Sequence, residues 1–400
     1  MIYSLEMKVC FETFGCRLNK AEALQMEADY LADGWEITTK HSDANLFVIR
    51  GCSVTARAQY ECEKLIAHLK RHYPAAGIKI CGCLSDVSKP SKPSKPSKPS
   101  KPSKPSKPSK PLPTRTARAY LKVQDGCAGK CTFCIVPKFR GESRSEPFTD
   151  LLDRAKRFID AGYHEIVVTG CNLALYASEG KRLPDLVSAL AGLDAGCRIR
   201  LGSLEPGACA QETIPAMAEA PNVCRFLHLP VQSGSNKVLL AMRRPYIVKD
   251  VENTATLASK LMPNLGLGCD LMTGFPGESE LDFAATRGLL KRLPFVHAHV
   301  FPFSERPGTL AVGFPRPLAK DIRSARARLL ADDMRAKRRK FAKTFIGKTV
   351  EIVVEDEKTG RGWTGEYLPC EPLSGSFVRK SVARVFVTKT RDDLLLGNLR

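Results

Sequence analysis

Hydrophobic and polar residues change period repeatedly along the first part of the chain. Short apolar runs predict buried strands at 9–14, 46–49 and 78–80. Between these runs, apolar residues recur at helical spacing and predict two helices, over 19–31 and 55–71. We expect Asn19 to cap the first helix, because its side chain can accept a hydrogen bond from the opening turn. Strands that alternate with helices predict a parallel α/β sheet over residues 1–87.

The same alternation resumes at residue 112 and continues to residue 343. Apolar runs predict six further strands, at 119–125, 165–170, 198–203, 227–229, 267–272 and 298–301. Helical stretches such as 150–159 separate the strands, so the region consists of about six β/α units. A full eightfold barrel would need a longer chain. The central region therefore predicts an incomplete α/β barrel.

The last part of the chain, residues 344–400, has a different pattern. Short runs of alternating polar and apolar residues at 347–354, 363–367 and 382–387 are typical of strands with one buried face. Glycines separate them at short intervals. We expect a small antiparallel barrel here.

The composition is that of a globular protein. The chain has 400 residues, 43% of them hydrophobic, which is enough for two or three domains. We find no transmembrane stretch, and the mixed and charged residues 1–8 do not resemble a secretory signal. Fifteen cysteines in such a chain indicate metal binding and buried thiols rather than disulfides. We therefore expect a protein of the reducing cytoplasm without a membrane partner.

A low-complexity segment separates the first region from the central one. Residues 88–111 are eight copies of Ser-Lys-Pro, and proline at every third position excludes helix and sheet. The repeat predicts an extended, charged linker. Its eight lysines are part of the net charge of +20, and without them +12 remains. That balance favours a polyanionic partner, most commonly nucleic acid.

The most specific motif is a loop with three cysteines, Cys127, Cys131 and Cys134, directly after the predicted strand at 119–125. A tetrahedral zinc site would need a fourth cysteine or histidine nearby, and the next cysteine is Cys171. An iron–sulfur cube that leaves one iron open fits three ligands better. Cysteines that merely fill a core are the third interpretation.

Three more cysteines, Cys16, Cys52 and Cys83, each follow the end of a predicted strand. The carboxyl ends of parallel strands lie along one edge of a sheet, where binding sites gather. These thiols therefore either converge on a second cluster or are separate structural cysteines, and the spacing alone leaves both open.

Two sets of residues carry a resemblance to a known family. The spacing of Cys127, Cys131 and Cys134, with Phe133 before the last, resembles the signature of the radical S-adenosylmethionine (SAM) enzymes. Residues 14–19 (Phe-Gly-Cys-Arg-Leu-Asn), residues 50–55 (Arg-Gly-Cys-Ser-Val-Thr) and Gly82–Cys83 are similar to the cluster-binding segments of the methylthiotransferase branch. The likeness spans nearly the whole chain apart from the repeat.

This resemblance implies two 4Fe-4S clusters and SAM as cofactors. The ligands that it implies are Cys16, Cys52 and Cys83 for one cluster, and Cys127, Cys131 and Cys134 for the other. Segments at predicted strand ends look like further family motifs and imply a SAM-binding set: Phe133, Gly170, Glu205, Gln232, Ser233 and Gly274. The fold implied is a cluster domain, a partial (β/α)6 barrel and a TRAM-like RNA-binding domain, over 1–87, 112–343 and 344–400.

The chain departs from the family in one respect. Residues 84–118 are mostly repeat, where family members usually carry more strands and helices, so we expect a trimmed first domain. In the last domain, basic residues suit phosphate contacts and Trp363 or Tyr367 can stack on a base. The basic helix predicted over 320–343 faces either solvent or RNA.

The segments around Cys16 and Cys52 look most like the branch that modifies threonylcarbamoyladenosine beside the tRNA anticodon. The implied reaction replaces the hydrogen at C2 of the base with a methylthio group, and implies a flavodoxin-type electron donor. Two alternatives within the family act on isopentenyladenosine in tRNA or on a ribosomal-protein aspartate. A third alternative is a non-catalytic iron–sulfur RNA-binding protein that has lost its second cluster.

Overall fold

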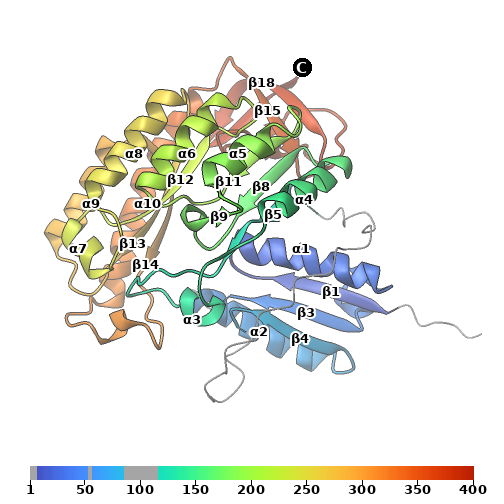
Figure 1. Cartoon of the computed structure of the whole chain (residues 1–400), viewed down its shortest axis with the longest axis horizontal. Coiled ribbons are helices and arrows are strands. Elements are labelled where there is room, and N and C mark those ends of the chain that lie inside the picture. The colour runs from blue at the N-terminus through green and yellow to red at the C-terminus, as the bar shows by residue number, and fades with distance from the viewer. Residues whose placement is uncertain (1–6, 53–55, 85–115) are drawn as a thin grey trace, which may run out of the picture. The chain divides into compact units, whose positions relative to one another are not determined.

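The computed structural model describes residues 7–52, 56–84 and 116–400 (Figure 1). The chain divides into two compact units, residues 1–114 with 138–140 and residues 115–137 with 141–400. The Ser-Lys-Pro repeat and its predicted linker conformation lie outside the described residues, as do residues 53–55 of one cluster-binding segment.

The first unit is built on a four-stranded sheet in the order β2-β1-β3-β4, with every neighbouring pair parallel. Its elements are β1 Lys8–Thr13, α1 Arg17–Ala32, β2 Glu36–Thr38, η1 His41–Asp43, β3 Leu46–Gly51, α2 Ala56–His72 and β4 Gly77–Gly82. The predicted parallel α/β sheet is confirmed. The sequence did not predict β2, whose three residues lack an apolar run.

Both faces of this sheet are covered, which explains why its strands read as continuous apolar runs. Phe47 and Ile49 pack on one face with Leu69 of α2. Val48 points to the other face and packs with Val9 of β1 and Met26 of α1.

The second unit contains six parallel strands in two three-stranded sheets, β11-β8-β5 and β12-β13-β14. Single bridges at Ser203–His228 and Ile199–Val223 connect the two sheets. The strands are β5 Ala119–Lys122, β8 Glu165–Thr169, β11 Arg198–Leu201, β12 Phe226–Gln232, β13 Gly266–Thr273 and β14 Phe295–Pro302. The partial (β/α)6 barrel expected from the sequence is confirmed.

One predicted strand is divided in two. Residues 119–125 read as a single strand, but β5 ends at Lys122 and β6, Gln124–Asp125, pairs antiparallel with β7, Arg144–Ser145. The short hairpin that results holds the three-cysteine loop at its closed end.

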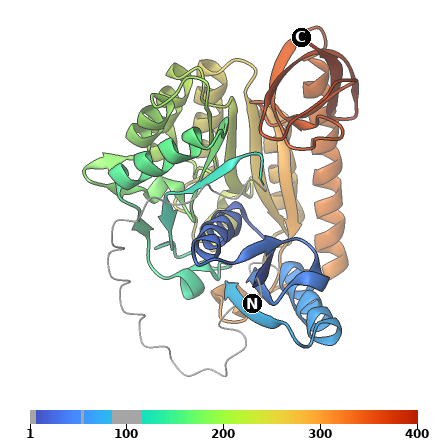
Figure 2. The same ribbon diagram turned by 90° about the vertical axis from the view of Figure 1, so that its right-hand side faces the viewer.

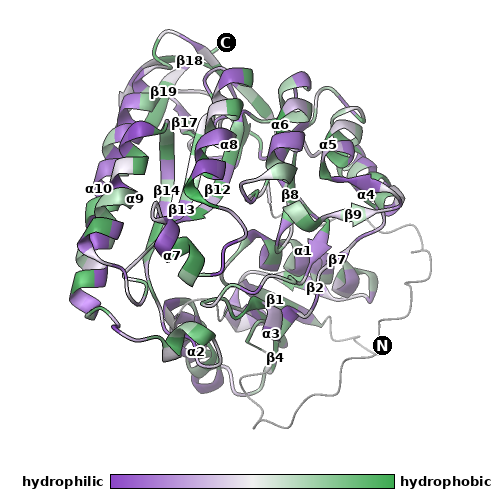
Figure 3. Ribbon diagram, turned by 60° about the vertical axis from the view of Figure 1, so that its left-hand side comes forward, coloured by the Kyte–Doolittle hydropathy of each residue, from purple (hydrophilic) through white to green (hydrophobic). Residues whose placement is uncertain are grey.

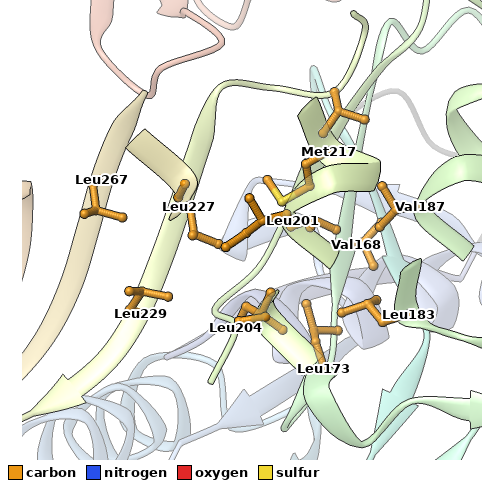
Figure 4. Close-up of a cluster of buried hydrophobic side chains, with 14 of the residues drawn as sticks. Val168, Leu173, Leu183, Val187, Leu201, Leu204, Met217, Leu227, Leu229 and Leu267 are labelled. Atoms are coloured by element: carbon orange, nitrogen blue, oxygen red, sulfur yellow. The ribbon is translucent and has the colours of Figure 1, made fainter. Parts of the chain in front are cut away.

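Helices cover the outer face of the strands (Figure 1). They are α4 Phe148–Asp160, α5 Leu183–Ala191, α6 Ala208–Glu219, α7 Asn236–Ala241, α8 Val248–Leu261, α9 Glu280–Arg292 and α10 Lys320–Lys343. The short helix α3, Val136–Arg140, follows the three-cysteine loop, and its residues 138–140 belong to the first unit. Short elements lie among them: η2 Leu173–Leu175, β9 Ala177–Ser178, β10 Lys181–Arg182 and η3 Leu310–Gly313. Figure 4 shows Leu183 and Met217 of the helices against Val168, Leu201 and Leu227 of the strands.

The C-terminal residues form a closed barrel in the order β15-β16-β17-β19-β18. Its strands are β15 Thr349–Val354, β16 Gly362–Trp363, β17 Pro369–Pro372, β18 Val382–Arg391 and β19 Leu394–Leu399. The predicted small barrel is confirmed, but β17 and β19 are parallel rather than antiparallel. The long helix α10 runs from this barrel along β14 (Figure 2) and is largely hydrophilic in colour (Figure 3).

The C-terminal barrel is joined to the α/β barrel by a buried cluster of charges around Glu165. The Glu165 carboxylate is fully buried, 2.7 Å from Nε of Arg200, 2.5 Å from Nη2 of Arg198 and 3.6 Å from Nη1 of Arg118. Burial alone would raise the pKa of Glu165, but the guanidinium groups outweigh it and hold the pKa well below its usual range. The same arginines donate across the joint, Arg198 to Glu351 O and Arg200 to Thr364 O.

Residues 363–367 close the base of the α/β barrel. The Tyr367 ring stacks on Trp363 and packs on Phe226, with ring centroids 4.6 Å apart in each case. A Cβ added at Gly266 would lie 2.1 Å from Glu366 O, so this strand start must be glycine for the chain segment to approach. The expectation that Tyr367 stacks on an RNA base is therefore wrong, because both of its neighbours are side chains of this chain.

None of the helices in the described residues combines the length and the apolarity needed to cross a bilayer.

We predict that Glu165→Gln lowers the free energy of unfolding by about 3–5 kcal/mol, because three buried arginines lose the charge that compensates them. Chemical denaturation monitored by circular dichroism measures the change. The matched control is Arg384→Ala, which breaks a 3.8 Å ion pair with Glu351 at a position whose side chain is 71% exposed. That variant should change stability by no more than about 0.5 kcal/mol. Equal stabilities for the two variants would show that the Glu165 cluster does not hold the joint.

Candidate active site

Three cysteines of the first unit follow three adjacent strands. Cys16 comes after β1, Cys52 after β3 and Cys83 after β4, and β3 pairs with both of the other strands. Cys52 and Cys83 are buried and Cys16 is exposed. The pairing places the three segments at one edge of the sheet, the geometry that a shared ligand needs.

The glycines before these cysteines allow the segments to pack closely. Gly15 has φ +90° and Gly82 has φ +81°, a backbone conformation that favours glycine. A Cβ at Gly15 would lie 2.7 Å from Cys52 Sγ, and a Cβ at Gly82 would lie 2.8 Å from Gly51 O. Any side chain at these positions would push the cysteine segments apart.

Asn19 ties two of these segments together. Its Nδ2 donates to Phe14 O at 2.8 Å and to Gly51 O at 3.1 Å, and the residue is 1% exposed. The prediction that Asn19 caps α1 is wrong, because the helix begins at Arg17 and Cys16 is the capping position. A polar residue at the start of a helix suggested a cap, and only the tertiary fold brings Gly51 within its reach.

The second set of cysteines lies in the loop between β6 and α3, and Gln124 organises the start of this loop. Gln124 is fully buried; its Nε2 donates to Gly126 O at 2.7 Å, and its Oε1 accepts from Asn172 N at 2.9 Å. Thr132 anchors the middle of the loop by donating to Ala241 O at 2.9 Å. Sequence reasoning missed Gln124, because a single glutamine at a strand end carries no spacing signal.

Arg244 links this loop to a strand end on the other side of the barrel. Its Nη1 donates to Cys131 Sγ at 3.1 Å, its Nη2 donates to Glu205, and its Nε donates to Tyr246 Oη at 2.8 Å. Burial raises the pKa of Cys131, and the Arg244 charge partly offsets this. Burial also raises the pKa of Cys134, to about 11. The contact of Arg244 with a predicted ligand cysteine could not be read from the sequence, because the two residues lie 113 positions apart.

Neither cysteine set has the spacing of a single-ion site. Four ligands around one zinc ion at 2.3 Å lie about 3.8 Å apart. In the described residues, the groups of three side chains whose ligand atoms all lie within 4.8 Å are His228–His297–His299 and Cys10–Glu12–His41, and neither contains these cysteines. Three thiols that share a loop or a sheet edge at wider separation fit the larger 4Fe-4S cube. Cys127, Cys131 and Cys134 would hold one cluster, and Cys16, Cys52 and Cys83 the other.

Two of the residues predicted to bind SAM present polar groups at strand ends. Gln232 ends β12 with φ +64°, is 6% exposed, and its Oε1 has no hydrogen-bond partner among the described residues. A strained backbone and an unpaired buried oxygen together are typical of a ligand site. Glu205, which follows β11, accepts from Asn172 Nδ2 at 3.1 Å as well as from Arg244.

The other four predicted SAM-binding residues contact the protein itself. Phe133 packs in a cluster with Met272, Phe275 and Phe303. A Cβ at Gly170 would lie 3.0 Å from Gln124 Oε1, and one at Gly274 would lie 2.1 Å from Arg323 Cγ. The Ser233 hydroxyl is 3.3 Å from Thr286 Oγ1. Their SAM contacts remain predictions.

We predict that Gly15→Ala removes the iron and sulfide of the Cys16 set and leaves those of the Cys127 set. Strain at positive φ costs about 1–2 kcal/mol, and the new methyl group also displaces Cys52. Iron and sulfide per chain, measured after anaerobic reconstitution, report the loss. Gly34→Ala is the matched control, because Gly34 has φ +85° but no atom within 4 Å of the added Cβ. Equal losses in both variants would contradict the role given to Gly15.

Comparison with known families gives two matches that together cover most of the chain. Residues 121–290 match the family described as "Radical SAM superfamily". Residues 8–98 match the one described as "Uncharacterized protein family UPF0004". The two matched regions contain all six cysteines of the predicted clusters.

Curated relatives resemble the chain over almost its full length. The threonylcarbamoyladenosine tRNA methylthiotransferase MtaB of Aquifex aeolicus is 29% identical over 88% of this chain and 93% of its own length. The enzyme of the same name from Bacillus subtilis is 29% identical over 94% of both chains. The tRNA-2-methylthio-N(6)-dimethylallyladenosine synthase of Methylacidiphilum infernorum is also 29% identical, over 90% of this chain and 91% of its own.

Among solved structures, the radical SAM methyltransferase TsrM of Kitasatospora setae has a similar fold. It matches with a TM-score of 0.55 and 12% identity, over 77% of this chain and 74% of its own. At this identity the likeness concerns the fold alone. It agrees with the parallel strands described above. The chain thus contains a radical SAM domain and a UPF0004 domain and is similar over most of its length to tRNA methylthiotransferases, and radical SAM enzymes use a 4Fe-4S cluster and S-adenosylmethionine.

Proposed function

We propose that the protein converts N6-threonylcarbamoyladenosine next to the tRNA anticodon to its 2-methylthio derivative. The observation that carries this proposal is the presence of two separate cysteine sets in one chain, each at the carboxyl ends of parallel strands. One set serves radical formation and the other serves sulfur transfer, two steps that a single cluster does not combine.

The chain's own residues position these groups. When bound, the clusters and SAM would supply three things: the sulfur, the methyl group, and the radical that removes hydrogen from C2 of the base. Gln124 and Thr132 hold the Cys127 loop, while Arg244 adds a positive charge beside Cys131. Gln232 and Glu205 offer polar atoms at the same strand ends for the cofactor. Asn19 and Gly15 hold together the segments that carry Cys16 and Cys52.

The RNA-binding surface that we propose lies on the C-terminal barrel. The net charge of +20 favours a nucleic-acid partner. Exposed basic residues of the C-terminal region include Lys358, Arg361, Arg379, Arg384, Lys389 and Arg391. The base must leave its stack to reach the strand ends, which costs less in an anticodon loop than in a duplex.

The basic helix α10 contributes less to this surface than its composition suggests. Arg326 pairs with Glu278 and Glu280, and Arg338 Nε lies 2.5 Å from Asp393 Oδ2. Lys337 donates to Leu293 O at 2.6 Å. These side chains hold the two barrels and neighbouring elements together. The helix was expected to face either solvent or RNA, and these internal contacts favour neither interpretation.

The substrate is the finer part of the proposal. Relatives named for threonylcarbamoyladenosine and for dimethylallyladenosine are equally similar, at 29% identity. The segments around Cys16 and Cys52 resemble the first branch more. A ribosomal-protein aspartate suits the basic charge less well. A flavodoxin-type reductant is proposed as the electron donor.

Mass spectrometry of tRNA nucleosides tests the substrate. Cells without the gene should accumulate threonylcarbamoyladenosine and lack its 2-methylthio form, and the intact chain should restore it. If the methylthio group disappears from isopentenyladenosine instead, the choice of substrate is wrong.

The division of labour between the clusters is tested with purified, reconstituted variants. Cys16→Ala should still cleave SAM to 5′-deoxyadenosine but form no methylthio product, whereas Cys127→Ala should lose both activities. Cys209→Ala, at a partly buried helix position outside both sets, is the control and should retain both. Loss of SAM cleavage in Cys16→Ala would contradict separate roles. A single cube per intact chain would instead support the non-catalytic alternative.

A further inference from the structure

The end of α3 belongs to a different compact unit from the cysteine loop that precedes it. Residues 138–140 group with the first unit, whereas residues 115–137 and 141–400 form the second. Arg140 is the last residue of α3 and lies six positions after Cys134. Its side chain is only 9% exposed, so its charge needs partners inside the protein.

Arg140 finds these partners on α1. Its Nη2 donates to Asn19 Oδ1 at 2.8 Å. Its Nη1 and Nη2 donate to the two carboxylate oxygens of Glu22, each at 3.1 Å. A planar guanidinium fork makes these three contacts at once, which the single ammonium group of a lysine does not reproduce.

The contact with Asn19 fixes the orientation of that side-chain amide. Because Asn19 Oδ1 accepts from Arg140, Asn19 Nδ2 is left to donate to Phe14 O and Gly51 O. These two carbonyl groups belong to the segments of the first two cysteines of the first unit. Arg140 therefore holds the amide in the orientation that joins them.

Glu22 extends the network to the remaining cysteine segment. Its carboxylate also accepts from Arg50 Nη2, and Arg50 lies two residues before Cys52. Arg50 Nη1 is 3.7 Å from the Sγ atom of Cys81, which lies two residues before Cys83. The network that begins at Arg140 thus touches all three cysteine segments of the first unit.

The residue after Arg140 belongs to the second unit and bonds the three-cysteine loop. Cys127 N donates to Gly141 O at 3.0 Å. Each of these contacts is internal to one unit, and the peptide bond from Arg140 to Gly141 joins them. A displacement of Arg140 therefore moves the backbone that holds Cys127.

We propose that Arg140 is a positioning residue that couples the two cysteine sets. Through α1 it gathers the first set, Cys16, Cys52 and Cys83, and through the following peptide bond it holds the three-cysteine loop. The inference rests on the two clusters of the proposed function and not on the choice of tRNA base.

The same network also places charge beside the first set. The guanidinium groups of Arg140 and Arg50 face one carboxylate, that of Glu22, so the three groups together carry one net positive charge. Positive charge near an iron–sulfur cluster favours its reduced form. Arg140 should therefore raise the reduction potential of the cluster that the first set would hold.

The first test uses the full chain with Cys127→Ala, Cys131→Ala and Cys134→Ala, so that any cube is bound by the first set. After anaerobic reconstitution this parent should hold about four iron ions per chain. Adding Arg140→Ala should lower the iron content by at least about half, because a group that orients the ligand segments is lost. The matched control is Lys138→Ala, which removes an exposed charge from the same helix and should leave the content unchanged.

The reduction potential of the same cube distinguishes positioning from simple packing. Arg140→Gln keeps a hydrogen-bond donor but loses the charge, so the cubes that this variant retains should have a lower midpoint potential than the parent. Arg140→Lys keeps the charge and should stay near the parent value. The measurement is a redox titration followed by electron paramagnetic resonance. Equal potentials in the parent and Arg140→Gln would overturn the role of Arg140 beside the first set.

Hydrogen exchange of the chain with all its cysteines tests the coupling. Arg140→Ala should speed exchange in residues 127–134 as well as in residues 14–19, and Lys138→Ala should change neither. Faster exchange in residues 14–19 alone would overturn the coupling, and iron content equal to that of the parent would overturn the positioning role. If the parent of the first test binds no cube at all, the two-cluster part of the proposed function fails, and this inference fails with it.

Discussion

The second unit depends on the burial of one carboxylate. Glu165 sits at the start of β8, fully enclosed, among three arginines that neutralise it. Arg198 and Arg200 also donate to carbonyl oxygens of the C-terminal barrel, and Arg118 pairs with the Glu355 carboxylate there. A six-stranded barrel is incomplete and would leave its base open. The Glu165 cluster closes that end and joins two barrels that have separate hydrophobic cores. The opposite end, where the strands finish, is left for chemistry.

Within the barrel, polarity is arranged in layers along the strands. Tyr367 and Arg200 form the base, with the Arg200 guanidinium 5.3 Å from the ring centre. His228, His299 and Asp270 lie above them, and Gln232 and Glu205 mark the strand ends. Alternate residues of the same strands face the helices and are apolar, so a single strand serves the core and the interior at once.

Glycine decides where the cysteine segments lie. At Gly15 and Gly82, positive φ and close contacts with neighbouring segments coincide, so no other residue fits without moving a cysteine. At Gly170 and Gly274 the space is taken by Gln124 and Arg323, side chains from other parts of the chain. Glycines at strand ends thus make room for neighbouring segments of the protein, in addition to any ligand that approaches the backbone there.

The sequence by itself predicted the two α/β regions and the small C-terminal barrel, and it singled out the six cysteines that we propose as cluster ligands. Apolar periodicity reports burial residue by residue, and the three-cysteine loop is local, so both are readable without contacts. The predictions for Asn19, as a helix cap, and for Tyr367, as a platform for an RNA base, were both wrong. In each case the partner lies in a segment that comes close only when the chain folds. Asn19 bonds Gly51, which lies 32 residues away, and Tyr367 packs on Phe226 of another barrel. The tertiary structure likewise decided that Arg244 reaches Cys131 and that His228, Asp270 and His299 converge, since side chains from separate strands meet only when the sheet fixes their register.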